Sequence, residues 1–235
     1  MGSPTRSQAI TLQPLIGVAF DLSMPWLQQA QRDAQRWLVL ASSPICVAEA
    51  LYRCRGGIAI VSESDLVEQA ARRLVADMCL GGEHQPEFAN ESPIGEPCNF
   101  SAAIWACPEP STWRDKVRLL GALAGGNALV VLCRGQLMPV LGPLGTKHLS
   151  GLASGSIPAV LNELFTLGYR VKQRYGVGGL ISLVCAALSR AAAWARRPEL
   201  VDRCEAAFRL ALTPPLASGP AVLEVIVLAR EVGRN

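Results

Sequence analysis

Four short apolar segments, separated by stretches with helical spacing, limit what this chain can fold into more than any other feature of its sequence. The segments are residues 37–41, 58–61, 101–107 and 128–133. Each has the length of a strand and is apolar almost throughout, which is typical of a strand covered on both faces. Because strands that alternate with helices pair in parallel βαβ units, the sequence predicts an α/β fold with a mainly parallel sheet.

The helices between these segments have recognisable starts. Ser43 is suited to cap a helix, and Pro44 is suited to its first turn, where the missing N–H costs no helical hydrogen bond. Asp65 and Glu68 have the spacing of a capping box, which predicts a second helix with Asp65 as its cap. That helix is predicted to bury a stripe formed by Leu66, Ala70, Leu74 and Met78.

The remaining elements follow from composition and spacing. Residues 83–98 contain three prolines and several acids, which predicts an irregular surface connection with room for a short further strand. A helix is predicted over residues 157–167 and a strand over residues 169–175. Residues 221–231 are mostly apolar on both faces and predict a strand that closes the sheet.

Two helices are predicted between these last two strands, as an insertion over about residues 176–213. The first, over about residues 178–195, is apolar almost all round, so we expect either the domain itself or a second chain to cover it. The insertion therefore predicts a protein partner or a homo-oligomer that binds through these helices. Of the 235 residues, we assign 1–35 to an N-terminal lead-in helical segment and 36–235 to one α/β domain.

Composition argues against several classes of function. The net charge is only +3, lysines and arginines are scattered, and aromatic residues make up 6% of the chain, so nucleic acid is not expected as a partner. The longest apolar run, residues 176–188, is shorter than the ~20 residues of a membrane-spanning helix. The N-terminus does not have the pattern of a signal peptide, and we therefore expect a cytoplasmic protein without a membrane span.

Eight cysteines and two histidines do not have the spacing of a metal site. No C-x-x-C pair occurs, and His84 and His148 lie far from each other in the sequence. Most of the cysteines stand inside apolar runs, where free cysteine behaves as a small hydrophobic residue. We expect reduced thiols in the core and no bound metal.

The order of elements over about residues 36–231 resembles that of a class I S-adenosylmethionine-dependent methyltransferase. The first-strand motif of that family, usually V-L-D-x-G-x-G-x-G, is matched in position by WLVLASSPICVAEAL (37–51). Its second-strand motif, in which an acid precedes a helix, is similar to IAIVSESDLVEQAARR (58–73). The segment 100–133 is similar to the fourth strand, helix, Gly-Gly turn and fifth strand, and LFTLGYRV (164–171) to the approach to the sixth.

This resemblance implies a Rossmann-like, doubly wound, mainly parallel sheet with an antiparallel last strand, and the inserted helices directly before that strand. It also implies S-adenosylmethionine as the cofactor. The positions that would bind it are Ser42 and Ser43 in the first turn, Glu63 after the second strand and Trp105 on the fourth. No catalytic residue is identified.

The cofactor motifs themselves are altered at three places. Serines, a proline and an isoleucine fill the first turn, where the glycines of the family let bare backbone approach the cofactor. Ser62 stands where the family has an acid for the ribose, with Glu63 one residue further on and on the other face of the strand. Ser101 follows Phe100 in place of the usual aspartate.

Two interpretations remain open at this point. In the first, the protein keeps the methyltransferase fold, has lost or changed cofactor binding, and acts by contact as an assembly subunit or regulatory pseudoenzyme. In the second, it is an active methyltransferase with a divergent pocket, in which Glu63 binds the ribose and Glu109 or Trp105 lines the substrate side. Site chemistry favours the first interpretation, because a turn without glycine must hold the cofactor differently.

Overall fold

The structure is a computed structural model. It describes residues 13–30, 36–54, 57–62, 64–78, 86–88, 100, 102–106, 108, 111–122, 128–138, 157–212 and 219–230.

A seven-stranded sheet forms the centre of the molecule, with the strand order β3-β2-β1-β4-β5-β7-β6. The strands are β1 (Arg36–Ala41), β2 (Gly57–Ser62), β3 (Glu87–Phe88), β4 (Ala102–Ala106), β5 (Ala128–Arg134), β6 (Tyr169–Val177) and β7 (Leu223–Arg230). Strands β3, β2, β1, β4 and β5 pair in parallel, whereas β7 is antiparallel to both β5 and β6. This confirms the predicted doubly wound sheet with an antiparallel last strand.

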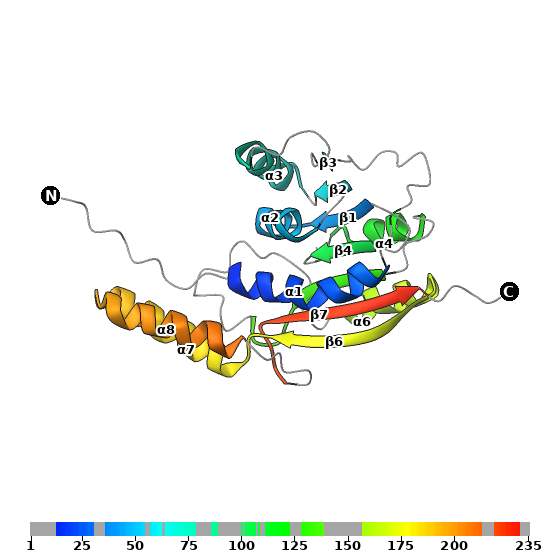
Figure 1. The fold of residues 1–235 in the computed structure, drawn as a ribbon. Coiled ribbons are helices and arrows are strands. Elements are labelled where there is room, and N and C mark those ends of the chain that lie inside the picture. Colours follow the sequence, from blue (N-terminus) through cyan, green and yellow to red (C-terminus); the bar gives the residue numbers. More distant parts are fainter. Residues whose placement is uncertain are drawn as a thin grey trace.

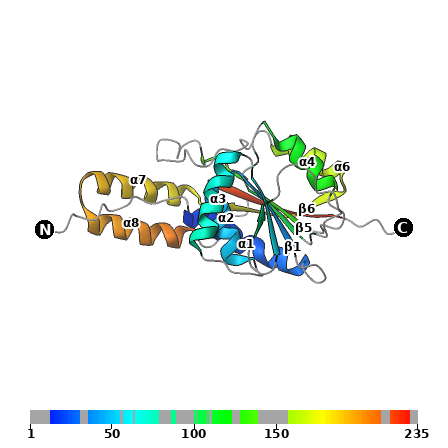
Figure 2. The same cartoon turned by 90° about the horizontal axis from the view of Figure 1, so that it is seen from above.

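Helices cover both faces of this sheet (Figure 2). They are α1 (Gln13–Ala30), α2 (Pro44–Arg53), α3 (Asp65–Asp77), α4 (Trp113–Ala122), α6 (Ile157–Thr166), α7 (Leu180–Trp194) and α8 (Pro198–Ala211). One buried cluster lies under α1 and α2, and the other lies under α4 and α6. Successive side chains of a strand point to opposite faces, so Val39 of β1 belongs to the first cluster and Leu38 and Leu40 to the second.

Helix α1 is an integral part of the first cluster. Its side chains Leu15, Ile16, Phe20 and Leu27 are fully buried, and the helix runs along β7 and β6 (Figure 1). The indole N–H of Trp26 donates a hydrogen bond to the hydroxyl of Tyr175 on β6 at 3.1 Å. The predicted lead-in helical segment therefore contains α1, and this helix closes one face of the sheet.

Helices α7 and α8 form an antiparallel hairpin between β6 and β7, as the predicted insertion requires. The hairpin projects away from the sheet at the end where β6 finishes (Figure 1 and Figure 2). Gly178, with φ of +75°, makes the turn from β6 into α7, and a Cβ there would lie 2.5 Å from Cδ2 of Leu15. The domain covers only one side of α7, which differs from a helix buried all round.

Candidate active site

The sheet changes direction between β1 and β4, because β1 is followed by β2 on one side and β4 lies on the other. In open α/β sheets, ligands bind at this switch point, beyond the carboxyl ends of the strands. Three strand ends meet there in register, with Ala41 of β1 opposite Ser62 of β2 and opposite Ala106 of β4. The predicted cofactor site would therefore lie at this edge of the sheet.

The connection after β1 is only two residues long, Ser42 and Ser43, before α2 begins at Pro44. Ser43 is the cap of α2, and its side-chain oxygen accepts a hydrogen bond from the N–H of Ile45 at 3.4 Å. Its carbonyl oxygen accepts the first helical bond from Cys46 at 3.1 Å. The helix thus starts directly at the strand end, and its cap is supplied by the chain itself, as predicted for Ser43 and Pro44.

Ser42 closes the gap between β1 and β4. Its side chain is buried, and its hydroxyl donates a hydrogen bond to the carbonyl oxygen of Ala106 at 3.1 Å. Ala106 is the last residue of β4, so this bond links the two strand ends on either side of the switch point. A side chain therefore occupies the bend where the family motif has bare backbone.

The other predicted site residues lie in different surroundings. Trp105 is fully buried in β4 and belongs to the cluster under α4 and α6. Glu63 lies outside the described residues. Ser62, at the end of β2, has a buried hydroxyl for which the described part of the chain offers no hydrogen-bond partner. The structure thus brings Ser42 and Ser43 to the switch point and places Trp105 in the core.

S-adenosylmethionine is the cofactor that the resemblance implies, and the described residues of this edge do not fit it in the manner of the family motif. The Ser42 side chain fills the bend, and its hydroxyl already donates a hydrogen bond to the carbonyl oxygen of Ala106. At the position of the ribose-binding acid, Ser62 offers a neutral hydroxyl in place of a carboxylate. A ligand held there would have to displace the Ser42 side chain from the carbonyl that it bonds.

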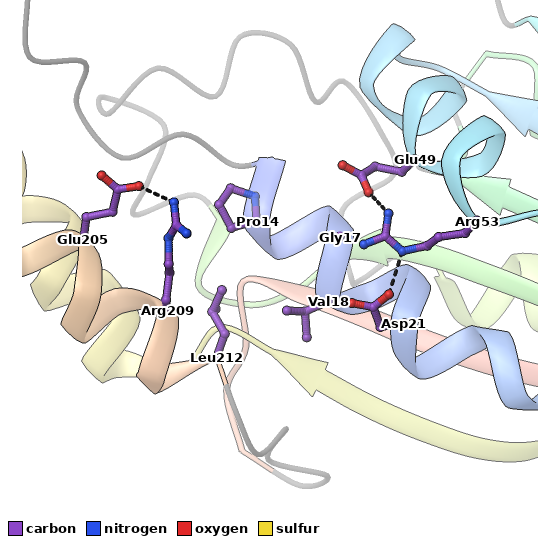
Figure 3. A pocket seen from close by; sticks show the side chains of 9 residues that line it. All are labelled: Pro14, Gly17, Val18, Asp21, Glu49, Arg53, Glu205, Arg209 and Leu212. Carbon is purple, nitrogen blue, oxygen red and sulfur yellow. Dashed lines mark hydrogen bonds and ion pairs between the residues drawn. The ribbon is translucent and has the colours of Figure 1, made fainter. Parts of the chain in front are cut away.

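A second recess lies on another part of the molecule, between α1, α2 and the end of α8 (Figure 3). Its volume is about 480 Å³, and its lining residues are Pro14, Gly17, Val18, Asp21, Glu49, Arg53, Glu205, Arg209 and Leu212. No motif marks these residues in the sequence, because they come from three elements that are far apart along the chain.

The charged groups of this recess are paired with one another. Arg53 binds Asp21 at 2.6 Å and also binds Glu49, while Arg209 binds Glu205 at 2.7 Å. Burial alone would lower the pKa of Arg53, but the hydrogen bond that Arg53 donates to Asp21 and the charge of Glu49 raise it above its usual value. The Arg53–Asp21 pair fastens α1 to α2, whereas each of the other two pairs lies within one helix, so the charges of the recess have a structural explanation.

Acidic side chains and free thiols occur at several places in the described part of the chain. Within it, no group of three or more histidine, cysteine, aspartate or glutamate side chains is arranged to hold a metal ion. The free cysteines described there are Cys46, Cys54, Cys133, Cys185 and Cys204. Burial raises the pKa of Cys54 to about 12, so this thiol stays protonated and unreactive near neutral pH. Among the helices that the structure describes, none has the length and apolarity to cross a membrane.

Comparison with known proteins shows the fold and leaves the chemistry open. No family model and no curated protein sequence matches the chain. Among solved structures, the methyltransferase domain of bacterial CtHen1 superposes with a TM-score of 0.58 at 9% identity, over 92% of this chain and 98% of that domain. An S-adenosylmethionine-dependent methyltransferase from Clostridium acetobutylicum matches with a TM-score of 0.52 at 7% identity, over 94% and 92% of the two chains.

A third similar structure is the [4+2]-cyclase SpnF, with a TM-score of 0.51 at 15% identity, over 91% of this chain and 82% of that one. Likenesses this distant in sequence establish architecture alone. The chain therefore has the class I methyltransferase fold that the order of its elements predicted.

Proposed function

We propose that this protein uses a class I methyltransferase fold without S-adenosylmethionine-dependent catalysis, and that it acts by protein–protein contact through the α7–α8 hairpin. The observation that carries the proposal is the hydrogen bond from Ser42 to the carbonyl of Ala106 across the switch point. The Ser42 side chain fills the place where the cofactor of such a fold would lie, and its hydrogen bond links the two strand ends there. We also propose the cytoplasm as its location, on the sequence evidence alone.

Energetics support this proposal. Moving the Ser42 side chain aside would leave a buried carbonyl without its donor, which costs about 1–3 kcal/mol. A ribose also gains no charged acceptor from Ser62, whose side chain is neutral. A cofactor would have to offset both costs before it gained any affinity.

The alternative is an active methyltransferase with a divergent pocket, and the two methyltransferases among the similar structures favour it. In that case Glu63 would bind the ribose and Glu109 or Trp105 would line the substrate side, although Trp105 would first have to leave its buried place in the core. The cyclase among the same neighbours illustrates that one fold supports more than one chemistry.

Isothermal titration calorimetry with S-adenosylmethionine and S-adenosylhomocysteine tests the proposal. We expect no saturable heat at ligand concentrations of about 1 mM, and no rise in the melting temperature, because a ligand stabilises only a folded state that binds it. A catalytically active class I methyltransferase, measured in the same buffer, is the positive control. A saturable heat with a matching thermal shift would support the enzyme instead.

The Ser42→Gly variant makes the test specific to the bend, because it removes the side chain that fills it. Binding by this variant alone would assign the loss of cofactor affinity to Ser42. Absence of binding in both proteins would mean that other features of the edge also exclude the ligand.

A further inference from the structure

Helix α7 exposes a continuous apolar face. The exposed fractions of its large side chains are 61% for Leu180, 70% for Ile181, 57% for Val184, 55% for Leu188 and 90% for Trp194. At 100° per residue these positions fall on one side of the helix. A single exposed leucine needs no explanation, but a contiguous apolar stripe of this kind marks an interaction surface.

The inner face of α7 is less apolar than this exposed face. It buries Leu183, Cys185 and Ala192, but also Ser182 and Ser189, whose hydroxyls have no hydrogen-bond partner within the described residues. Of the five leucine, isoleucine and valine side chains of α7, four are therefore exposed and only Leu183 is buried. A helix that packed only within its own domain would bury most of them.

The neighbouring helix α8 shows what a water-facing helix of this hairpin looks like. Its outer surface is mostly charged, with Glu199, Asp202, Arg203 and Arg209 all exposed beside two exposed leucines, Leu200 and Leu210. In α7, by contrast, Arg190 is the one charged residue among fifteen. The difference indicates that the outer face of α7 is covered in the working protein.

The exposed face has the spacing of a coiled-coil seam. Leu180, Val184, Ala187, Ala191 and Trp194 follow one another at intervals of four, three, four and three residues, and all five are exposed. Such a 4-3-4-3 pattern places one row of side chains along the contact line of two packed helices. The helix is about 22 Å long at 1.5 Å per residue, which is enough for two heptads.

We propose that a second copy of this chain covers α7, with the two α7 helices packed antiparallel about a two-fold axis. In this register Leu180 lies opposite the partner's Ala191, and Val184 lies opposite the partner's Ala187. Each layer of the seam thus combines one large and one small side chain, which is what close packing of two helices requires. The fit is reciprocal, because a two-fold axis applies the same pairing twice.

The ends of the helices agree with this register. Trp194 of one copy lies opposite the start of α7 in the other, where the cap residue Gly179 has no side chain. The hairpin also projects away from the sheet (Figure 2), so two hairpins can meet without contact between the sheets.

The area suits a weak and reversible dimer. Trp194 offers roughly 200 Å² of surface, and with the four exposed aliphatic side chains the face offers on the order of 500 Å². Two copies would bury about 1,000 Å², at the lower limit of specific interfaces. We therefore expect a dissociation constant in the micromolar range.

Sedimentation velocity of the full chain over a wide range of micromolar concentrations tests the dimer. We expect the wild-type chain to shift from monomer to dimer, and the Val184→Glu variant to weaken the dimer at least about tenfold, because its carboxylate would be buried in the seam. Leu210→Glu is the matched control. It changes a similarly exposed leucine of α8 that lies off the seam, and it should leave the dissociation constant unchanged.

Mixing two variants tests the antiparallel register. Val184→Glu and Ala187→Lys should each be monomeric alone, and their equimolar mixture should form a heterodimer, because the new carboxylate and ammonium lie opposite each other in one layer while the other layer stays native. At a concentration low enough for the wild-type chain to be monomeric, circular dichroism of each variant should show the wild-type melting temperature, since both positions are exposed in the monomer.

A wild-type chain that stays monomeric at 200 µM would overturn the proposal, whatever it binds instead. Co-sedimentation of such a monomer with vesicles of phosphatidylcholine and phosphatidylserine would assign the face to a membrane surface. A mixture of the two charged variants that remains monomeric would overturn the antiparallel register. The inference rests on the proposed function, but its tests are separate: a monomer that does not bind S-adenosylmethionine contradicts the dimer and leaves the contact function with another protein standing.

Discussion

Two buried serines, Ser42 and Ser189, differ in whether their hydroxyls have a hydrogen-bond partner. Ser42 donates its hydroxyl to the carbonyl of Ala106 at 3.1 Å. Ser189, in α7, has a buried hydroxyl without a partner among the described residues. A buried hydrogen bond and a buried unsatisfied hydroxyl contribute to stability with opposite signs.

Replacing each serine with alanine should therefore change stability in opposite directions. We expect Ser42→Ala to lower the free energy of unfolding by about 1–2 kcal/mol, because the Ala106 carbonyl loses its donor. We expect Ser189→Ala to leave it unchanged or raise it by up to ~1 kcal/mol, because an unpaired hydroxyl is removed and alanine favours a helix. Urea unfolding followed by circular dichroism measures both. A loss of stability in Ser189→Ala equal to that in Ser42→Ala would contradict this account.

Cys54 gives stability a dependence on pH. Burial raises the pKa of this thiol from its ordinary value of 9.0 to about 12, and the charge of Arg53 opposes the shift. Between these two values the unfolded chain releases a proton that the folded chain keeps, so the contribution is complete below pH 9 and falls as the pH rises toward 12. The expected slope is about 1.4 kcal/mol per pH unit.

The pH dependence can be isolated with the Cys54→Ala variant. Urea unfolding at pH values from 8 to 10.5 should show stability that falls with pH in the wild-type chain and falls less steeply in the variant. Burial also raises the pKa of Tyr169, so a residual slope is expected in both proteins. Equal slopes above pH 9 would mean that the Cys54 thiol is not buried in the native state.

At the scale of elements, the entry into α7 depends on a single glycine. Gly178 has φ of +75°, and an added Cβ would lie 2.5 Å from Cδ2 of Leu15 and 3.3 Å from Cβ of Val222. Gly168, before β6, has a similar φ of +87°, but there the nearest atoms are those of Arg230 at 3.8 Å. The two glycines share a backbone requirement and differ in the available space.

Substitution of these glycines by alanine should separate strain from steric clash. Gly168→Ala is expected to cost about 1–2 kcal/mol, the price of a left-handed conformation for a residue with a Cβ. Gly178→Ala is expected to cost at least ~1 kcal/mol more, because Leu15 is fully buried and must repack. Thermal unfolding measured side by side provides the comparison. Equal losses of stability in the two variants would show that Leu15 repacks without a free-energy cost.

Helix α3 shows how far periodicity can predict an element. Its existence and extent agree with the sequence, but Ser64 rather than Asp65 is the cap, through a bond from the N–H of Val67. Its buried side consists of Ala71 and Val75, while Leu66 is 78% exposed. Because α3 lies beside α2 at the edge of the sheet, its buried side is narrow, and small residues satisfy it as well as leucines would.

At the scale of the whole molecule, the fold was predictable because its signals are local. Strand-length apolar runs and helix starts fix the βαβ order, and that order restricts the topology. The bond from Ser42 to Ala106 was not predictable, because it joins residues 64 positions apart through the register of two strands. For α7, the apolar composition runs all round the helix, so the sequence does not indicate which side the domain leaves exposed, and the structure does.

Helix α1 is linked to both α2 and β6 by its side chains. Besides its buried side chains, it is joined to α2 by the ion pair of Asp21 with Arg53 and to β6 by the bond from Trp26 to Tyr175. Gly17 lets Arg53 approach closely, since a Cβ there would lie 3.2 Å from its guanidinium nitrogen. The first face of the sheet therefore depends on a helix that the sequence assigned to a lead-in segment.

The Phe20→Ala variant tests how much stability this helix provides. Phe20 is fully buried under the sheet, and truncation of a buried phenylalanine typically costs about 3–5 kcal/mol, a large part of the 5–15 kcal/mol that stabilises a typical domain. Gln28→Ala, at an exposed position of the same helix, is the matched control and should stay within ~0.5 kcal/mol of the wild-type chain. Urea unfolding followed by tryptophan fluorescence measures both variants. If α1 were a dispensable lead-in, both would unfold like the wild-type chain, whereas a helix that closes the core requires the large loss to be confined to Phe20→Ala.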